Sequence, residues 1–229
     1  MTVASSTEHR GALGHTVERN NRRARWLHAA VYVTVLPLLA TGWWLRTGHE
    51  GRPSLLARAT GVADVELHTV VGWVLAAVAI AGLLIGWRAA VFLLRSSVQF
   101  RRSDLRWFTR WPTALATGRF VWHDGHFDPG QRVANLVMVT LLALLVGSGA
   151  GLVTVSGGPI YVWLSRVHRW STYVFTPVII GHVFIGAGIL PAYRGVWRAM
   201  HMGGRLHHED AQRVWPGWLA RRDTRGPAE

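Results

Sequence analysis

The chain has 229 residues, half of them hydrophobic, and its 25 basic residues against 12 acidic ones give a formal net charge of +13 at pH 7. The hydrophobic residues form long uncharged runs, which argues against an ordinary soluble domain. The positive charge therefore lies outside these runs, where membrane topology explains it better than nucleic-acid binding does. The absence of cysteine excludes disulfides, iron–sulfur clusters and a cysteine-ligated haem within this chain.

Four uncharged apolar runs are predicted to be transmembrane helices. A helix needs about 20 apolar residues to cross the hydrocarbon core, and the runs cover residues 26–45, 67–87, 133–155 and 170–190. The first run follows arginines, as a signal peptide does, but it is long and lacks a clear small-residue cleavage site, so we expect a retained helix. The sequence therefore predicts an all-α integral membrane protein, built as a bundle of four transmembrane helices.

The arginines predict the orientation of these helices. Most of them lie in the N-terminal segment, the 88–132 loop and the segment after Pro191, and few lie in the two other loops. Basic residues near helix ends stay on the cytoplasmic side, so both termini and the central loop are predicted to be cytoplasmic. Within this loop, Trp107, Phe108 and Trp111 stand among arginines, which predicts an interfacial segment with its rings at headgroup level.

Three regions follow along the chain. Residues 1–20 are polar and lack apolar periodicity, so we expect a flexible N-terminal tail. Residues 21–200 hold the four-helix membrane domain. Residues 201–229 are polar and are expected to form a cytoplasmic C-terminal tail, in which Trp215 and Trp218 are candidate membrane anchors.

Four of the twelve histidines lie in or at the edges of the predicted helices, and they are His28, His68, His168 and His182. Ionisable residues are costly in a membrane and normally face a functional interior, although a single buried histidine bonded to a carbonyl is about as common as a ligand. The spacing favours ligands. His168 and His182 are 14 residues apart, which places them within about 40° on one helix face and about 21 Å apart along it.

The predicted topology supplies a partner for each of these two histidines. His68, near the outer start of the second helix, lies at the level of His168, and His28 lies on the inner side toward which His182 points. Two histidines on facing helices can occupy both axial positions of a haem iron, which leaves no open position for a substrate and favours electron transfer. Two haem b groups stacked across the membrane are therefore predicted.

Arginines beside these histidines are candidates for pairing with haem propionates. Arg169 is the strongest candidate, followed by Arg25 and Arg166. Flanking arginines are also ordinary headgroup anchors, so this role has a plain alternative.

With the histidines placed in this way, residues 20–200 resemble the gamma subunit of membrane-bound formate dehydrogenase, within the wider bacterial cytochrome b561 and nickel-iron hydrogenase cytochrome b group. In that family one haem ligand comes from the first helix, one from the second and two, 14 residues apart, from the fourth. The resemblance implies that His68 and His168 hold the outer haem iron, and that His28 and His182 hold the inner one.

The same family has a motif like Tyr-Asn-Ala-Gly-Gln-Lys before its third helix, beside a quinone site. Here residues 127–132 read Phe-Asp-Pro-Gly-Gln-Arg. Gly130 and Gln131 match the motif, while Asp128 replaces the family's asparagine. The resemblance implies a quinone site at Asp128, Gly130 and Gln131, in which the carboxyl group could deliver protons.

The expected function is electron transfer across the membrane between a formate dehydrogenase-like complex, with its catalytic and iron–sulfur subunits, and menaquinone or ubiquinone. The chain has no catalytic motif of its own, so the primary oxidation belongs to another subunit. Alternatives are the cytochrome b subunit of a hydrogenase or thiosulfate reductase complex, a haem-free anchoring subunit, or a transporter that uses these histidines without haem.

Overall fold

The computed structural model describes residues 15–49 and 51–224, which divide into two compact units. Of the described residues, the helical unit comprises those within 26–90 and 137–179, and the cap unit comprises those within 1–25, 91–136 and 180–229. Each unit is described by itself below.

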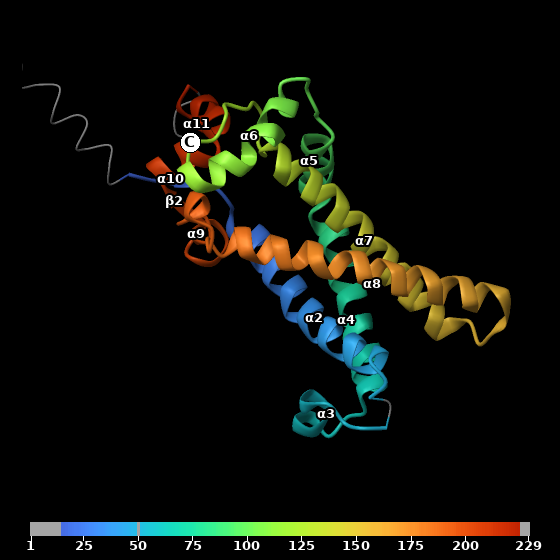
Figure 1. Ribbon diagram of the computed structural model, residues 1–229. Coiled ribbons are helices and arrows are strands. Elements are labelled where there is room, and N and C mark those ends of the chain that lie inside the picture. Colours follow the sequence, from blue (N-terminus) through green and yellow to red (C-terminus); the bar gives the residue numbers. More distant parts are fainter. Residues whose placement is uncertain (1–14, 50, 225–229) are drawn as a thin grey trace, which may run out of the picture. The chain divides into compact units, whose positions relative to one another are not determined.

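The four predicted spans correspond to four long helices, which contribute most of the helical unit (Figure 1): α2 Arg22–Arg46, α4 Asp64–Ile85, α7 Pro129–Thr154 and α8 Gly158–Gly186. In the described part of the chain, α2, α4 and α7 are long and apolar enough to cross a membrane, and α8 reaches this standard together with the helical segment Pro191–His201, which is bent from it by 63°. A short helix, α3 Leu55–Thr60, precedes α4. The predicted multi-pass helical membrane protein is confirmed at this level.

The fourth helix begins twelve residues earlier than predicted. Gly158 has a φ of +80°, a conformation open mainly to glycine, and Pro159 follows in the first turn, where its missing N–H costs nothing. Arg166 and Arg169 interrupt the apolar run but not the helix. His168 therefore lies well inside α8, and both arginines are helical residues.

The interior of the helical unit is small. One large apolar residue from each long helix contributes to it, namely Val35, Leu75, Leu141 and Phe175. Many other apolar side chains on these helices are exposed, including Ile80, Leu84, Val153 and Ile180. Exposed apolar surfaces of this kind are expected where a protein is surrounded by lipid rather than water.

The cap unit is built from short elements around its own core. Strand β1 Thr16–Glu18 pairs antiparallel with β2 Arg205–His207, with Val17 opposite Leu206. The helices are α5 Trp87–Ser97, which begins in the helical unit, α6 Asp104–Thr117, the 3-10 helix η1 Pro191–Tyr193, α9 Arg198–His201, α10 His208–Val214 and α11 Pro216–Asp223. Tyr193, Leu206 and Trp215 lie in its core. The two strands add a small sheet to the predicted all-α fold.

The segment after His201 is folded through Asp223, although its composition suggested a polar tail. It forms β2, α10 and α11, and Trp215 is buried in the cap core. At the other end, Thr16–Glu18 forms a strand within the segment predicted to be a flexible tail; residues 1–14 and 225–229 lie outside the described residues. Elements this short are stabilised by packing against distant segments, which composition does not reveal.

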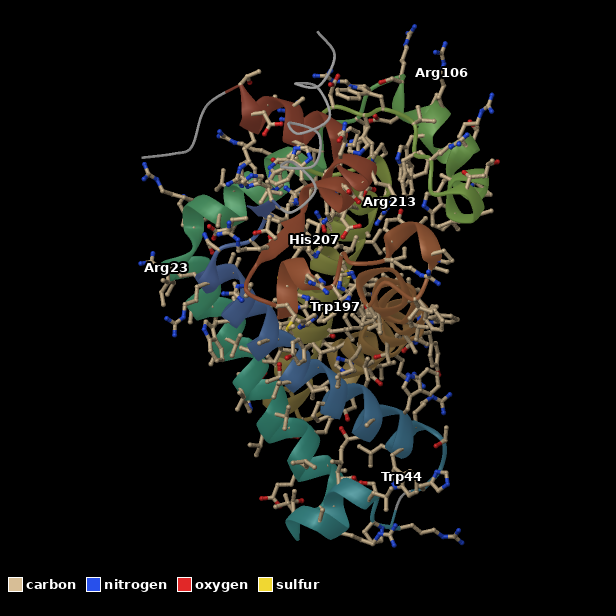
Figure 2. All side chains as sticks on the ribbon, turned by 90° about the vertical axis from the view of Figure 1, so that its left-hand side faces the viewer. Arg23, Trp44, Arg106, Trp197, His207 and Arg213 are labelled. Carbon is tan, nitrogen blue, oxygen red and sulfur yellow. The ribbon has the colours of Figure 1, made fainter. Side chains whose placement is uncertain are left out.

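The predicted interfacial segment is helical, but its aromatic residues have different surroundings. Trp107 is 3% exposed and packs on Gly130, where an added Cβ would lie 2.7 Å from the indole ring. Trp111 donates a hydrogen bond to the Tyr193 hydroxyl at 3.0 Å. Phe108 is exposed, and Figure 2 shows Arg106 pointing away from the ribbon. Trp107 thus supports the cap core, contrary to its predicted place among the headgroups.

Candidate functional site

His68 on α4 and His168 on α8 face each other within the helical unit. Their ring centroids are 6.2 Å apart and their planes are inclined by 78°. A metal–imidazole bond is about 2 Å long and a ring centroid lies about 1 Å behind the ligating nitrogen, so one metal ion between two such rings separates the centroids by about 6 Å. The separation of the two rings therefore suits two ligands of one haem iron.

A buried hydroxyl group defines which nitrogen of each ring is available. Thr41 Oγ1 on α2 lies 2.9 Å from His68 Nδ1 and donates its own proton to the Pro37 carbonyl at 2.8 Å. With the hydroxyl proton directed to that carbonyl, the oxygen can accept an N–H from His68 Nδ1. A neutral imidazole protonated at Nδ1 has its lone pair on Nε2. This tautomer of His68 would present Nε2 as a ligand.

The same arrangement recurs at the second histidine. Ser148 Oγ on α7 lies 3.0 Å from His168 Nδ1 and donates to the Leu144 carbonyl. The same contact allows the His168 tautomer in which Nδ1 is protonated and Nε2 is available. Sequence analysis missed both hydroxyl groups.

A glycine follows each of these hydroxyl residues and admits the ring. A Cβ on Gly42 would lie 3.2 Å from His68 Cε1, and a Cβ on Gly149 would lie 3.4 Å from His168 Cε1. The dipeptides Thr-Gly and Ser-Gly thus serve the histidine of the following long helix in each case. A hydroxyl–glycine pair in the helix before each histidine is the sequence signal that could have revealed this.

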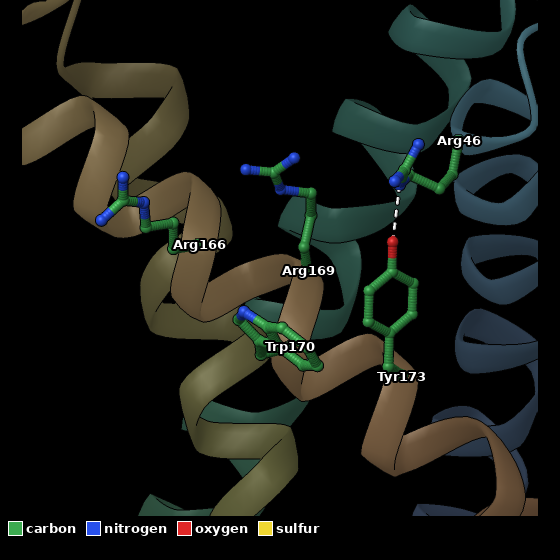
Figure 3. A pocket seen from close by; sticks show the side chains of 5 residues that line it. All are labelled: Arg46, Arg166, Arg169, Trp170 and Tyr173. Atoms are coloured by element: carbon green, nitrogen blue, oxygen red, sulfur yellow. Dashed lines mark hydrogen bonds between the residues drawn. The ribbon is translucent and has the colours of Figure 1, made fainter.

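Three arginines line an open pocket of about 280 Å³ in the same unit (Figure 3), together with Trp170 and Tyr173. Arg46 Nε donates to the Tyr173 hydroxyl at 2.6 Å. Among the described residues, no ion pair involves Arg46, Arg166 or Arg169. Arginines without carboxylate partners around one pocket suit an anionic group. Arg25, the other propionate candidate, belongs to the cap unit, and its buried Nε has no hydrogen-bond partner there.

The predicted inner pair has one histidine in each unit. His28 lies on α2 in the helical unit, in an edge contact with the Tyr32 ring at a centroid distance of 5.7 Å. His182 lies on the part of α8 that belongs to the cap unit. Their pairing therefore stays a prediction.

The three residues of the predicted quinone site have partners within the cap unit. Asp128 Oδ1 accepts the Gln131 N–H at 2.8 Å in the first turn of α7, and Gln131 Oε1 accepts the Trp215 indole N–H at 3.1 Å. Gly130 lies under the Trp107 ring. Burial raises the pKa of Asp128. These contacts give all three residues a structural role, and their contact with a quinone stays a prediction.

Arg19 is a second feature that sequence analysis missed. Its guanidinium group lies between the rings of Trp215 and Trp218, at 4.6 and 4.5 Å from their centroids, and donates to the His126 ring. Burial lowers the pKa of Arg19 to about 9, and burial together with the charge of Arg19 lowers the pKa of His126 to about 3. Arg19 thus joins the N-terminal segment to α11 and the 118–128 loop.

Comparison with known proteins places these features in a family. A family model described as prokaryotic cytochrome b561 matches residues 19–203, a range that contains all four predicted ligand histidines and most of the chain. No curated protein matches the chain. Proteins of the matched family are electron-transfer membrane subunits that bind haem b. The match and the helices agree, and the chain belongs to the prokaryotic cytochrome b561 family.

Proposed function

We propose that the chain is the di-haem cytochrome b subunit of a respiratory complex, and that it transfers electrons across the bacterial inner membrane between a formate dehydrogenase-type partner and the quinone pool. The observation that carries the proposal is the His68–His168 pair, whose centroid distance of 6.2 Å suits one shared iron. The termini are proposed to be cytoplasmic, as the arginine distribution favours.

The chain's own residues hold and orient the cofactor. His68 and His168 would hold the outer haem, and His28 and His182 would hold the inner haem. Haem b supplies a one-electron iron couple when bound. With two histidines for each iron, the chain would leave no position for substrate, and oxidation of formate or a similar donor would belong to the catalytic and iron–sulfur subunits of the partner complex.

Arg169 is proposed to pair with a propionate of the outer haem, with Arg46 and Arg166 on the same pocket. The absence of carboxylates among the residues that line this pocket supports the assignment. A guanidinium group binds a carboxylate through parallel hydrogen bonds, so these arginines also orient the macrocycle about the line between the two histidines.

Quinone reduction is proposed to occur on the cytoplasmic side, near Asp128, Gly130 and Gln131. Because burial raises the pKa of Asp128, this carboxyl group holds a proton more readily than an exposed aspartate. A group of this kind can act as the proton donor that quinone reduction requires. The formate dehydrogenase-type partner and the di-haem content are proposed from the resemblance to that family, in which the two ligands on the fourth helix are 14 residues apart, as His168 and His182 are here.

A dithionite-reduced minus air-oxidised spectrum of the purified chain, with haem quantified per polypeptide, tests the proposal. We expect a b-type alpha band and two haems per chain. His68→Ala and His182→Ala should each remove one haem, whereas the control His49→Ala, whose ring stacks on Trp44 near the end of α2, should remove none. A folded, colourless protein would refute the proposal.

A further inference from the structure

We propose that Thr41 and Ser148 are a pair of positioning residues that together set the ligating nitrogen, the ring plane and the electron-donor strength of His68 and His168. The inference rests on the proposed haem ligation by these histidines. Neither hydroxyl group touches the iron, so each acts through the imidazole that it holds.

Both hydroxyl groups are buried, and each has a backbone carbonyl group of its own helix as a hydrogen-bond acceptor. Thr41 is 1% exposed and Ser148 is 4% exposed, so water does not replace their contacts with the rings. Each donates to the carbonyl four residues earlier, Thr41 to Pro37 and Ser148 to Leu144. With its proton directed to the carbonyl, each oxygen accepts a hydrogen bond from the imidazole, and Nδ1 is then the protonated nitrogen.

The contact with histidine goes beyond what a buried hydroxyl residue in a membrane helix needs. Thr34 on α2 is 7% exposed and is satisfied by the carbonyls of Ala30 and Val31 alone. Thr41 and Ser148 have such carbonyl bonds and, in addition, contact an imidazole on a neighbouring helix. Thr34 therefore provides a matched control.

The arrangement occurs once in each helix hairpin of the unit. In the first hairpin the hydroxyl residue lies on α2 and the histidine on α4, and in the second they lie on α7 and α8. The two segments between them differ in length, 27 residues from Thr41 to His68 and 20 from Ser148 to His168. The two contacts therefore form in separate hairpins whose connections differ in length.

Two properties of the bound haem should depend on these contacts. An acceptor on Nδ1–H makes the imidazole a stronger donor to its metal, which favours the ferric state and lowers the midpoint potential. The two contacts also hold the ring planes 78° apart. Axial imidazoles that are nearly perpendicular give a low-spin ferric haem a strongly anisotropic EPR spectrum, with one dominant low-field feature.

The test compares Thr41→Val with Thr41→Ser in the purified full-length chain. Thr41→Val keeps the branched shape and removes the hydroxyl group, whereas Thr41→Ser keeps the hydroxyl group and removes a methyl group. Ser148→Ala is measured beside them, and Thr34→Val and Ser171→Ala serve as controls for buried hydroxyl groups that form no hydrogen bond to either ring within the described part of the chain. The readouts are the potential of the haem that His68→Ala removes, and its EPR spectrum.

We expect Thr41→Val and Ser148→Ala each to raise this potential. A tenfold change in the ferrous-to-ferric ratio, which equals about 59 mV for a one-electron couple, is the expected scale. In both variants the EPR spectrum should change from one dominant low-field feature to a rhombic spectrum. Thr41→Ser and the two controls should resemble the wild type. Loss of this haem in Thr41→Val with retention in Thr41→Ser would also support the proposal.

Two results would overturn the inference while leaving the cytochrome proposal intact. One is a haem in Thr41→Val and Ser148→Ala with the same potential and EPR spectrum as in Thr34→Val. The other is equal haem loss in Thr41→Val and Thr41→Ser. A wild-type chain that binds no haem would instead refute the proposed function itself.

Discussion

The imidazole rings of His68 and His168 lie 6.2 Å apart between α4 and α8, with their planes 78° from each other. Because one iron would need both rings, their contributions to haem binding should not be additive. His68→Ala, His168→Ala and the double variant should each lose the same single haem, measured by pyridine haemochrome per chain. Loss of different haems in the two single variants would contradict the pair.

A methyl group at Gly42 should disturb the site more than one at Gly149. An added Cβ would lie 3.2 Å from His68 Cε1 in the first case and 3.4 Å from His168 Cε1 in the second. The His68 ring is held by Thr41 and cannot retreat freely. We expect Gly42→Ala to weaken retention of the outer haem about tenfold, measured by transfer to apomyoglobin. Gly147→Ala, whose Cβ would meet nothing within 4 Å, is the control.

Loss of a positive charge from the arginine pocket should lower the outer haem's potential. Reduction adds negative charge, which a nearby arginine stabilises. Arg169→Gln and Arg46→Gln should lower the midpoint potential by less than about 59 mV, the one-electron equivalent of tenfold, because the open pocket is screened by solvent. The effect should shrink at high salt. The exposed Arg58 on α3 provides the control Arg58→Gln, and an equal shift there would contradict the assignment.

The buried ion pair between Asp104 and Arg132 should be essential to the cap unit. Arg132 Nη1 lies 2.9 Å from Asp104 Oδ2, and both side chains are almost fully buried. Asp104→Asn leaves the Arg132 charge without its counterion, which should cost the cap about 3 kcal/mol or more. The exposed Arg101–Asp124 pair is the contrast, and Arg101→Gln should cost about 1 kcal/mol at most.

Limited proteolysis of the intact protein measures this difference, because cleavage in the 101–128 region follows local opening of the cap. Faster cleavage is expected in Asp104→Asn and little change in Arg101→Gln. Equal cleavage rates in the two variants would show that the buried Asp104–Arg132 pair stabilises the cap no more than the exposed Arg101–Asp124 pair does.

The cap should lose stability in acid through His126. Its pKa is lowered from 6.5 to about 3 in the folded state, first by burial and then by the Arg19 charge. A group with a lowered folded pKa binds more protons when unfolded, so its contribution is complete above about pH 6.5 and is lost as the pH falls toward about 3. The slope is at most about 1.4 kcal/mol per pH unit for one group, reduced here because the ring is partly exposed.

The pH effect is isolated by comparing the wild type with His126→Gln, which cannot gain the charge. The raised pKa of Asp128 acts in the opposite direction, since protonation of that group favours the folded state. The difference in cap cleavage rate between the two proteins is measured from pH 7.5 down to about pH 4. This difference should narrow as the pH falls. A constant difference would exclude His126 as the source.

Much of the membrane architecture was predictable from local pattern. Three of the four helices begin and end within four residues of the predicted apolar runs, because a lipid-crossing helix needs an uncharged run of defined length. The fourth was predicted to begin too late, because Arg166 and Arg169 end the apolar run while Gly158 and Pro159 define the helix start. Helix direction predicted that His68 and His168 lie at the same depth, and their ring centroids are 6.2 Å apart.

The cap and the hydroxyl contacts were not predictable in this way. Arg19, His126 and Trp215 are far apart in the chain, and the short elements that carry them show no apolar periodicity. Their burial depends on partners more than 80 residues away, such as Gln131 for Trp215 and His126 for Arg19.

The sequence by itself determined the membrane class, the helices and the histidines, because hydropathy and helix geometry act over one or a few turns. Only the tertiary structure decided that Thr41 and Ser148 hold Nδ1 of the two facing imidazoles, that Asp128 and Gln131 are bonded within the cap, and that the C-terminal segment folds. These outcomes depend on side-chain hydrogen bonds between segments distant in the chain, and such bonds exist only once the helices have packed.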